Sequence, residues 1–178
     1  MLERDIFAGF GGQGVLLMGQ LLAYAAMIED KQVAWLPSYG PEMRGGTANC
    51  SVTISDKAVA SPIVDYPTAV IVMNRPSLDK FEKKLIKGGN LFINSSIIDR
   101  KAERDDIDVY YVPCNDIALA MGDLRVANIV MLGAYLAITQ CVTVDSLMDA
   151  LLHKLGERKA HLLPINRQAF EKGAAIVK

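Results

Sequence analysis

Gly9-Phe10-Gly11-Gly12-Gln13-Gly14-Val15 decides the fold, because it joins a strand-like apolar run to a helix-like apolar run. The first run is Ile6 to Ala8, and the second is Val15 to Ile28. The glycines have the spacing G-x-G-x-x-G, and glycine permits a tight turn or the close approach of another molecule. In this strand–loop–helix order, the N–H groups that start the helix face a bound anion.

A second glycine-rich stretch, Pro37-Ser38-Tyr39-Gly40-Pro41-Glu42-Met43-Arg44-Gly45-Gly46-Thr47, follows the next strand-like run, Val33 to Leu36. Two loops that each follow a strand should lie at the same edge of a parallel sheet, where open α/β sheets bind ligands. Glu42 could accept a hydrogen bond or transfer a proton, and Arg44 could hold a carboxylate or phosphate. Docking against another chain, ligand contact and a purely structural Glu–Arg pair all stay open.

The first loop is an incomplete dinucleotide fingerprint. An acidic residue that binds the ribose should close the second strand, yet Leu36 is followed by Pro37, and Glu42 is the first acid. Two other readings remain: a different phosphate-bearing ligand, or glycines that serve only helix–strand packing. Gln13 adds a polarity that packing alone would not need.

Strand-like and helix-like runs alternate along the rest of the chain. This pattern predicts one α/β domain over residues 1–178, a three-layer Rossmann-like fold with a mixed, mostly parallel sheet and helices on both faces. In the first helix, a stripe from Leu16 to Met27 has helical period. A hairpin between 47–55 and 58–61 is also expected. The predicted strands are 4–8, 33–36, 47–55, 68–73, 91–93 and 109–112, and the later helices begin near 76, 114, 126, 143 and 162.

Composition narrows the class of partner. The chain has 51% apolar residues, 22% charged residues and a net charge of −1, which gives no basic field for nucleic acid. A sheet covered on both faces and a permanent subunit interface both explain the apolar excess. The longest apolar runs are too short to cross a membrane, which takes about 20 residues. No signal-type core follows Met1, so we expect a cytoplasmic protein without a membrane partner.

Metal and nucleophile chemistry are not expected in this chain. Cys50, Cys114 and Cys141 are widely separated and form no C-x-x-C pair, so buried free thiols are the prediction. His153 and His161 lie far from the glycine loops in sequence and are expected at the surface or at a helix cap. No nucleophile–base–orienter set is present, and no catalytic residue is predicted.

Taken together, the strings Gly9–Gly14 and Pro37–Gly46 resemble the gamma subunit of the 2-oxoacid:ferredoxin oxidoreductases, and the likeness continues through 47–55, Asn128 and Gly133. The resemblance implies a complex that converts a 2-oxoacid to an acyl-CoA with ferredoxin as electron acceptor. It implies that alpha, beta and ferredoxin-like delta subunits are partners. Thiamine diphosphate, Mg and 4Fe-4S clusters would belong to those subunits, and coenzyme A would be a substrate.

Carried over residue by residue, the resemblance makes both loops candidates for cofactor binding. The first motif would contact a phosphate or nucleotide, and the second would form the inter-subunit edge of the active site. We expect the helix after Gly14 and the Arg44 guanidinium to supply positive potential for coenzyme A phosphates. The alternatives are a stand-alone nucleotide-binding protein and a purely structural subunit. Within the family, 2-oxoglutarate or a branched-chain 2-oxoacid is the preferred substrate. The candidate residues are Gly11, Gly12, Gln13, Gly14, Ser38, Tyr39, Gly40, Glu42, Arg44 and Gly46.

Overall fold

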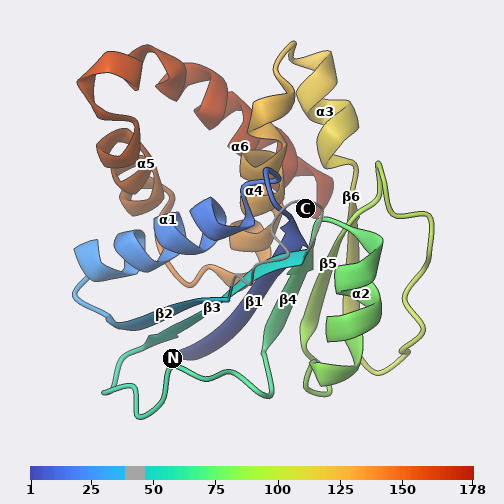
Figure 1. The fold of residues 1–178 in the computed structure, drawn as a ribbon. Helices are drawn as coiled ribbons and strands as arrows, with labels where there is room; N and C mark the ends of the chain where they lie inside the picture. The colour runs from blue at the N-terminus through green and yellow to red at the C-terminus, as the bar shows by residue number, and fades with distance from the viewer. Residues whose placement is uncertain (39–46) are drawn as a thin grey trace.

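The computed structural model describes residues 1–38 and 47–178, which form one α/β domain (Figure 1). Within these residues a six-stranded sheet has the order β2-β3-β1-β4-β5-β6. The strands are β1 Leu2–Phe10, β2 Gln32–Ser38, β3 Thr47–Ser55, β4 Ala69–Val72, β5 Asn90–Asn94 and β6 Asp108–Val112. The helices are α1 Val15–Ile28, α2 Arg75–Phe81, α3 Cys114–Ala120, α4 Ala127–Thr139, α5 Val144–Lys159 and α6 Leu163–Ile176. Short 3₁₀ turns cover Glu82–Lys84, Leu124–Val126 and Ala160–Leu162.

The sheet is mixed and mostly parallel in direction, which confirms the predicted fold class. β1, β4, β5 and β6 pair in parallel, whereas β3 is antiparallel to both β1 and β2. Because β3 lies between them, β1 and β2 run in the same direction. Their carboxyl ends therefore share one edge of the sheet, with Phe10 opposite Thr47 and Ser38 opposite Asn49.

The predicted hairpin between 47–55 and 58–61 is wrong. Both edges of β3 are already hydrogen-bonded, one to β1 and the other to β2. A strand at 58–61 would have no edge left to pair with. The segment instead runs as a loop along the lower edge of the sheet beside the N-terminus (Figure 1).

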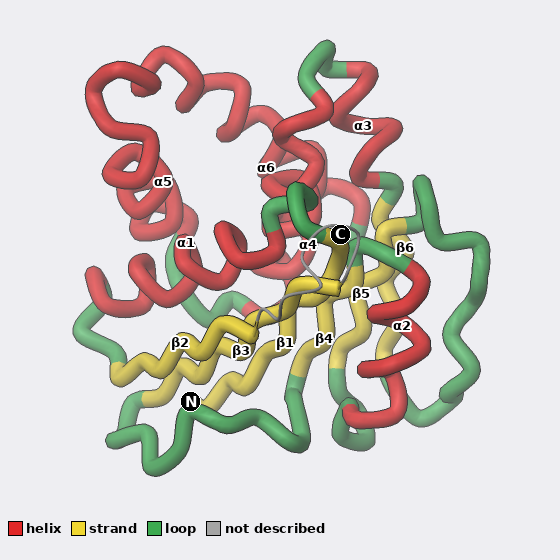
Figure 2. Tube along the Cα trace, in the orientation of Figure 1, coloured by secondary structure: helices red, strands yellow, loops and turns green. Residues whose placement is uncertain are grey.

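Two apolar cores lie on the two faces of the sheet, and strand residues alternate between them as the pleat requires. Phe7, Ile71 and Phe92 belong to the core that packs on α1 and α3–α6. Their strand neighbours, such as Ile6, Val70 and Leu91, belong to the smaller core under α2. Figure 2 shows the strand layer between these two groups of helices.

The sequence pattern did not say which face of α1 packs on the sheet, and the structure shows that its small residues form that face. Tyr24 and Met27 are exposed, whereas the small residues of α1 are buried. A Cβ atom on Gly19 would lie 2.5 Å from the Cys50 Sγ of β3. Small side chains therefore let α1 lie close on the sheet, and the larger stripe turns toward α5.

The closest helix crossing joins α4 to α6. A Cβ atom on Gly133 would lie 2.0 Å from the carbonyl oxygen of Phe170, and one on Gly173 would lie 1.8 Å from that of Val130. Two glycines thus allow the two backbones to touch. This contact fixes α4, whose first turn contributes to the site described next.

Candidate functional site

Gln13 holds the first glycine loop in one shape. Its side-chain Oε1 accepts a hydrogen bond from the Phe10 N–H at 2.6 Å, and its Nε2 donates to the Met73 carbonyl at 2.9 Å. The loop after β1 is thereby tied to the end of β4, its parallel neighbour. The polarity of Gln13 has a structural use, which sequence reasoning had left open.

The glycines of the loop have different reasons to be glycine. Gly14 precedes α1 in the left-handed region, with φ 75°, and a Cβ there would lie 2.4 Å from Asn128 Nδ2. A Cβ on Gly9 would lie 2.7 Å from the Gln13 amide oxygen. Gly12 has φ 93°, yet its Cβ position faces open space. Packing therefore explains Gly9 and Gly14, while Gly12 borders solvent.

A cleft of about 320 Å³ opens between this loop and the start of α4. Gly12, Gln13 and Gly14 line one side, and Asn115, Arg125 and Asn128 line the other. Asn128 is 5% exposed, and its buried side-chain oxygen has no hydrogen-bond partner among the described residues. A buried amide without a partner costs stability unless a bound molecule satisfies it.

The electrostatics of the cleft favour an anion. The N–H groups in the first turn of α1 lack helical partners and point toward the loop side, where the helix dipole is positive. Arg125 stands at the rim, with its guanidinium bound to both carboxylate oxygens of Asp123 at 2.8 Å. Asp123 offsets part of the Arg125 charge, so the helix start and the Asn128 amide are the main polar groups that an anion in the cleft would meet.

The structure brings together only part of the predicted site. Gly12, Gln13 and Gly14 line the cleft, and Gly11 is exposed beside it. Ser38 lies at the same sheet edge but across β3, and it is not among the described residues that line the cleft. Tyr39, Gly40, Glu42, Arg44 and Gly46 lie outside the described residues. Sequence reasoning missed Asn115 and Arg125, and it noted Asn128 only as part of the resemblance.

The sheet order also bears on dinucleotide binding. The parallel neighbour of β1 is β4 rather than β2. Asn74 follows β4, and its side-chain oxygen accepts from the Ser77 N–H to cap α2. The position where a dinucleotide fold places its ribose-binding acid is thus taken by a helix cap.

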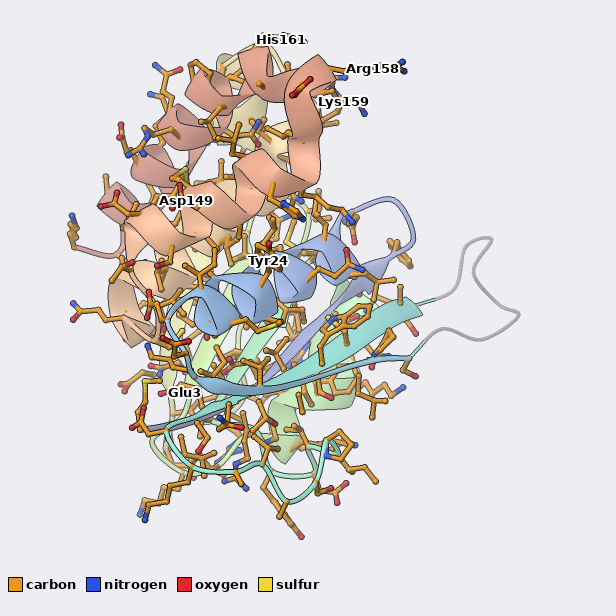
Figure 3. The ribbon with its side chains drawn as sticks, turned by 90° about the vertical axis from the view of Figure 1, so that its left-hand side faces the viewer. Glu3, Tyr24, Asp149, Arg158, Lys159 and His161 are labelled. Carbon is orange, nitrogen blue, oxygen red and sulfur yellow. The ribbon has the colours of Figure 1, made fainter. Side chains whose placement is uncertain are left out.

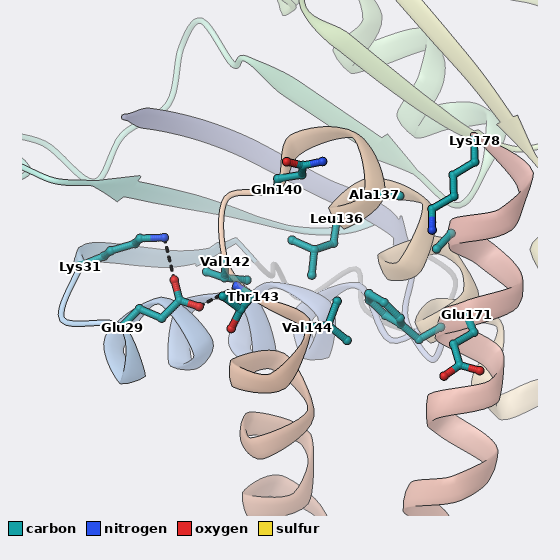
Figure 4. A pocket seen from close by; sticks show the side chains of 12 residues that line it. Glu29, Lys31, Leu136, Ala137, Gln140, Val142, Thr143, Val144, Glu171 and Lys178 are labelled. Carbon is teal, nitrogen blue, oxygen red and sulfur yellow. Dashed lines mark hydrogen bonds and ion pairs between the residues drawn. The ribbon is translucent and has the colours of Figure 1, made fainter.

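A larger cavity of about 610 Å³ lies at the opposite end of α1 (Figure 4). Two of its charged groups are paired: the Lys31 Nζ lies 2.7 Å from Glu29, and the Thr143 N–H donates to Glu29 at 2.6 Å. Burial opposes ionisation of Glu29, but these two donors hold its pKa at about 2. The Glu29 carboxylate of this cavity is thus satisfied within the fold, unlike the Asn128 side-chain oxygen.

The cysteines and histidines lie where the sequence predicts. All three cysteines are buried and unbridged, and burial raises the pKa of Cys50 to about 12 and that of Cys141 to about 11. His153 is exposed and stacks on Tyr24 with ring centroids 4.8 Å apart. His161 lies with Arg158 and Lys159 at the outer tip of the helices, away from the sheet (Figure 3).

Within 1–38 and 47–178, no three His, Cys, Asp or Glu side chains are grouped so that they could hold a metal ion. No helix within these ranges has the length and apolarity needed to cross a membrane.

Known proteins are similar to this chain in sequence. The chain is 39% identical over 172 residues to the ketoisovalerate oxidoreductase subunit VorA of Methanothermobacter marburgensis, covering 96% of this chain and 36% of VorA. It is 35% identical to the 2-oxoglutarate synthase subunit KorC of Methanocaldococcus jannaschii, covering 99% of this chain and 95% of KorC. The chain thus spans about a third of VorA and nearly all of KorC.

The fold of this chain is also similar to that of a solved structure. The gamma subunit of a keto/oxoacid ferredoxin oxidoreductase from Geobacter sulfurreducens superposes with a TM-score of 0.83 at 32% identity, covering 98% of both chains. The family described as Pyruvate ferredoxin/flavodoxin oxidoreductase matches residues 4–176. The chain therefore belongs to the pyruvate ferredoxin/flavodoxin oxidoreductase family and has the fold of its gamma subunits.

Proposed function

We propose that this chain is the gamma subunit of a 2-oxoacid:ferredoxin oxidoreductase, and that the glycine-loop cleft holds part of coenzyme A. The complex would oxidise a 2-oxoacid to an acyl-CoA and pass the electrons to ferredoxin. Alpha, beta and ferredoxin-like delta subunits would carry thiamine diphosphate, Mg and 4Fe-4S clusters, which supply decarboxylation and electron transfer. The relatives VorA and KorC are named for ketoisovalerate and 2-oxoglutarate, in line with the preferred substrates. A cytoplasmic location is part of the same proposal.

The observation that carries the coenzyme A assignment is the Asn128 side chain. It is buried beside Gly14 and lines the cleft, and its oxygen lacks a hydrogen-bond partner among the described residues. Coenzyme A offers phosphates to the start of α1 and amide or amino groups to Asn128. Gln13 holds the loop in shape before any ligand arrives, which reduces the ordering cost of binding.

The contribution of this chain to the reaction would be orientation. Fixing a thiol donor beside a reacting acyl group removes translational and rotational freedom, which can lower a barrier by several kcal/mol, about 7–11 in favourable cases. Arg44, which lies outside the described residues, is proposed from the sequence alone to add positive charge for the phosphates.

Asn128→Leu tests the cleft, because leucine keeps the branched shape and the heavy-atom count of asparagine and removes its amide. We expect the dissociation constant for coenzyme A, measured by equilibrium dialysis on the assembled complex, to rise about 5- to 10-fold. The control Glu171→Gln, in the cavity of Figure 4, should leave binding unchanged. Arg44→Ala should weaken the coenzyme A dependence of turnover while 2-oxoacid decarboxylation stays measurable.

Native mass spectrometry of the chain purified from its own cells tests the subunit assignment. Partner chains that carry thiamine diphosphate and Fe–S clusters are expected. A lone chain that binds NAD would instead support the stand-alone nucleotide-binding alternative. Coenzyme A binding that is identical in Asn128→Leu and wild type would refute the assignment of the cleft.

A further inference from the structure

A second cavity, of about 640 Å³, lies over the amino end of β1, at the opposite edge of the sheet from the glycine loop. The cavity is on the face of the sheet that carries α2. Arg4 and Ile6 are two residues apart on β1, so their side chains point to the same face, and Ile6 belongs to the core under α2. The loop after β3 closes it from the side, and Leu2, Val59 and Ile63 supply apolar walls.

Two polar side chains at this cavity are left without partners. Arg4 and Thr53 stand directly opposite each other on β1 and β3, so their side chains share one face. Within residues 1–38 and 47–178, no carboxylate pairs with the Arg4 guanidinium, and its buried Nε has no hydrogen-bond partner. Thr53 is 4% exposed, and its Oγ1 also has none. Two adjacent buried donors without acceptors indicate a missing anionic partner.

The other hydroxyl groups and the acid that line the cavity are already engaged. The Ser55 hydroxyl accepts from the Lys57 N–H at 3.0 Å, and the Ser61 hydroxyl accepts from the Ile63 N–H at 3.1 Å. Asp56, the acid among the described lining residues, is paired with the amine of Met1. None of these groups is placed to neutralise Arg4.

We propose that Arg4 and Thr53 form a carboxylate-binding site, distinct from the glycine-loop cleft. The forked guanidinium matches the two oxygens of a carboxylate, and the Thr53 hydroxyl can donate a further hydrogen bond. The apolar walls select a carboxylate on a short apolar stem. That group can come from a free organic acid or from an Asp or Glu side chain of another subunit; the second source rests on the proposed complex.

The first experiment follows the Arg4 Nε–Hε and Thr53 amide resonances of the ¹⁵N-labelled full chain during titration with acetate, propionate and isobutyrate at constant ionic strength. A free-acid site gives saturable shifts that tighten as the stem lengthens, and neutral isobutyramide gives none. Arg4→Gln should abolish saturation, and Thr53→Val, which exchanges a hydroxyl for a methyl, should weaken binding about tenfold. Arg167→Gln, at an exposed position of α6, is the matched control.

The second experiment distinguishes the subunit side chain. Arginine-selective modification with phenylglyoxal, read by mass spectrometry, should modify Arg4 in the isolated chain and spare it in the assembled complex. Arg4→Gln should then also lower retention of the partner subunit while coenzyme A binding at the glycine loop persists. The proposal would be overturned if the isolated chain shows no saturable shifts and the complex also fails to protect Arg4. If no complex forms, the titration alone decides the proposal.

Discussion

Replacing Gly133 by alanine should destabilise the fold and also disturb the glycine-loop cleft, which is the proposed coenzyme A site. The added methyl would lie 2.0 Å from the Phe170 carbonyl oxygen, whereas a carbon–oxygen contact of this kind needs about 3.3 Å. The obstacle is backbone, so no rotation of a side chain relieves it. α4 and α6 must separate by about 1 Å or more.

The magnitude follows from two opposing effects. Overpacking of this kind costs about 3 kcal/mol, at the upper end of its range because both elements are rigid. Alanine regains about 1 kcal/mol over glycine in a helix interior. The net loss in the free energy of unfolding should be about 2 kcal/mol. With a urea m-value on the order of 3 kcal/mol/M, the midpoint should fall by about 0.7 M.

Urea unfolding with an unchanged m-value is the assay, and equilibrium dialysis of coenzyme A is the second readout. Asn128 lies five residues before Gly133 on α4, so the same displacement should move its amide away from Gly14 and weaken binding. Ala175→Gly, exposed on α6, gives the cost of a helical glycine alone, about 1 kcal/mol. A Gly133→Ala variant as stable as wild type would show that the crossing has slack and would refute the reasoning.

Three further substitutions test other parts of the structure. Burial raises the pKa of Asp5, whose carboxylate accepts from the Tyr135 hydroxyl at 2.7 Å, well above its ordinary 3.8. The folded chain therefore keeps a proton on Asp5 that the unfolded chain releases. The free energy of unfolding should fall as pH rises above about 4, by up to about 1.4 kcal/mol per pH unit until the folded pKa is reached. Asp5→Asn should flatten this slope in urea titrations at pH 5 to 8. Glu82 is buried, lies 2.6 Å from Arg100 Nη2 and accepts hydrogen bonds from two loop N–H groups. Glu82→Gln should therefore lower the free energy of unfolding by about 2–3 kcal/mol and speed amide hydrogen exchange at residues 103 and 104. Unchanged exchange at these two residues would contradict this. Gly12→Asn should lower the free energy of unfolding by less than about 1 kcal/mol, because asparagine tolerates positive φ. It should weaken coenzyme A binding more than that, because the new side chain fills the cleft. A loss of binding free energy no larger than the loss of unfolding free energy would count against a ligand at Gly12.

Local patterns predict the elements well, and the sheet order poorly. The bounds of α1 and β3 match the predicted 15–28 and 47–55 at both ends, since an apolar run after a glycine loop and a tidy alternation are local signals. The insertion of β3 between β1 and β2 depends on contacts far apart in sequence. It overturned the expected hairpin while preserving the shared edge of β1 and β2.

The candidate site was predictable on one side only. The glycine spacing places Gly12, Gln13 and Gly14 at a helix start, but the opposite wall comes from residues more than 100 positions later. Asn128 could have been suspected, because it is a polar residue at the start of the apolar run 126–139. Its position against Gly14 requires the crossing of α4 and α6, which periodicity cannot show.

Packing accounts for two glycines of the first loop, and the proposed ligand role concerns a third. Gly9 and Gly14 are required by the fold, because a side chain at either would collide with Gln13 or Asn128. Gly12 meets nothing at its Cβ position, so only its φ angle and the cleft beside it constrain the residue. The two packed glycines bring the loop and the Asn128 amide together, and the third keeps the opening between them clear. The close packing of this loop therefore creates the cleft in which we propose that a ligand binds.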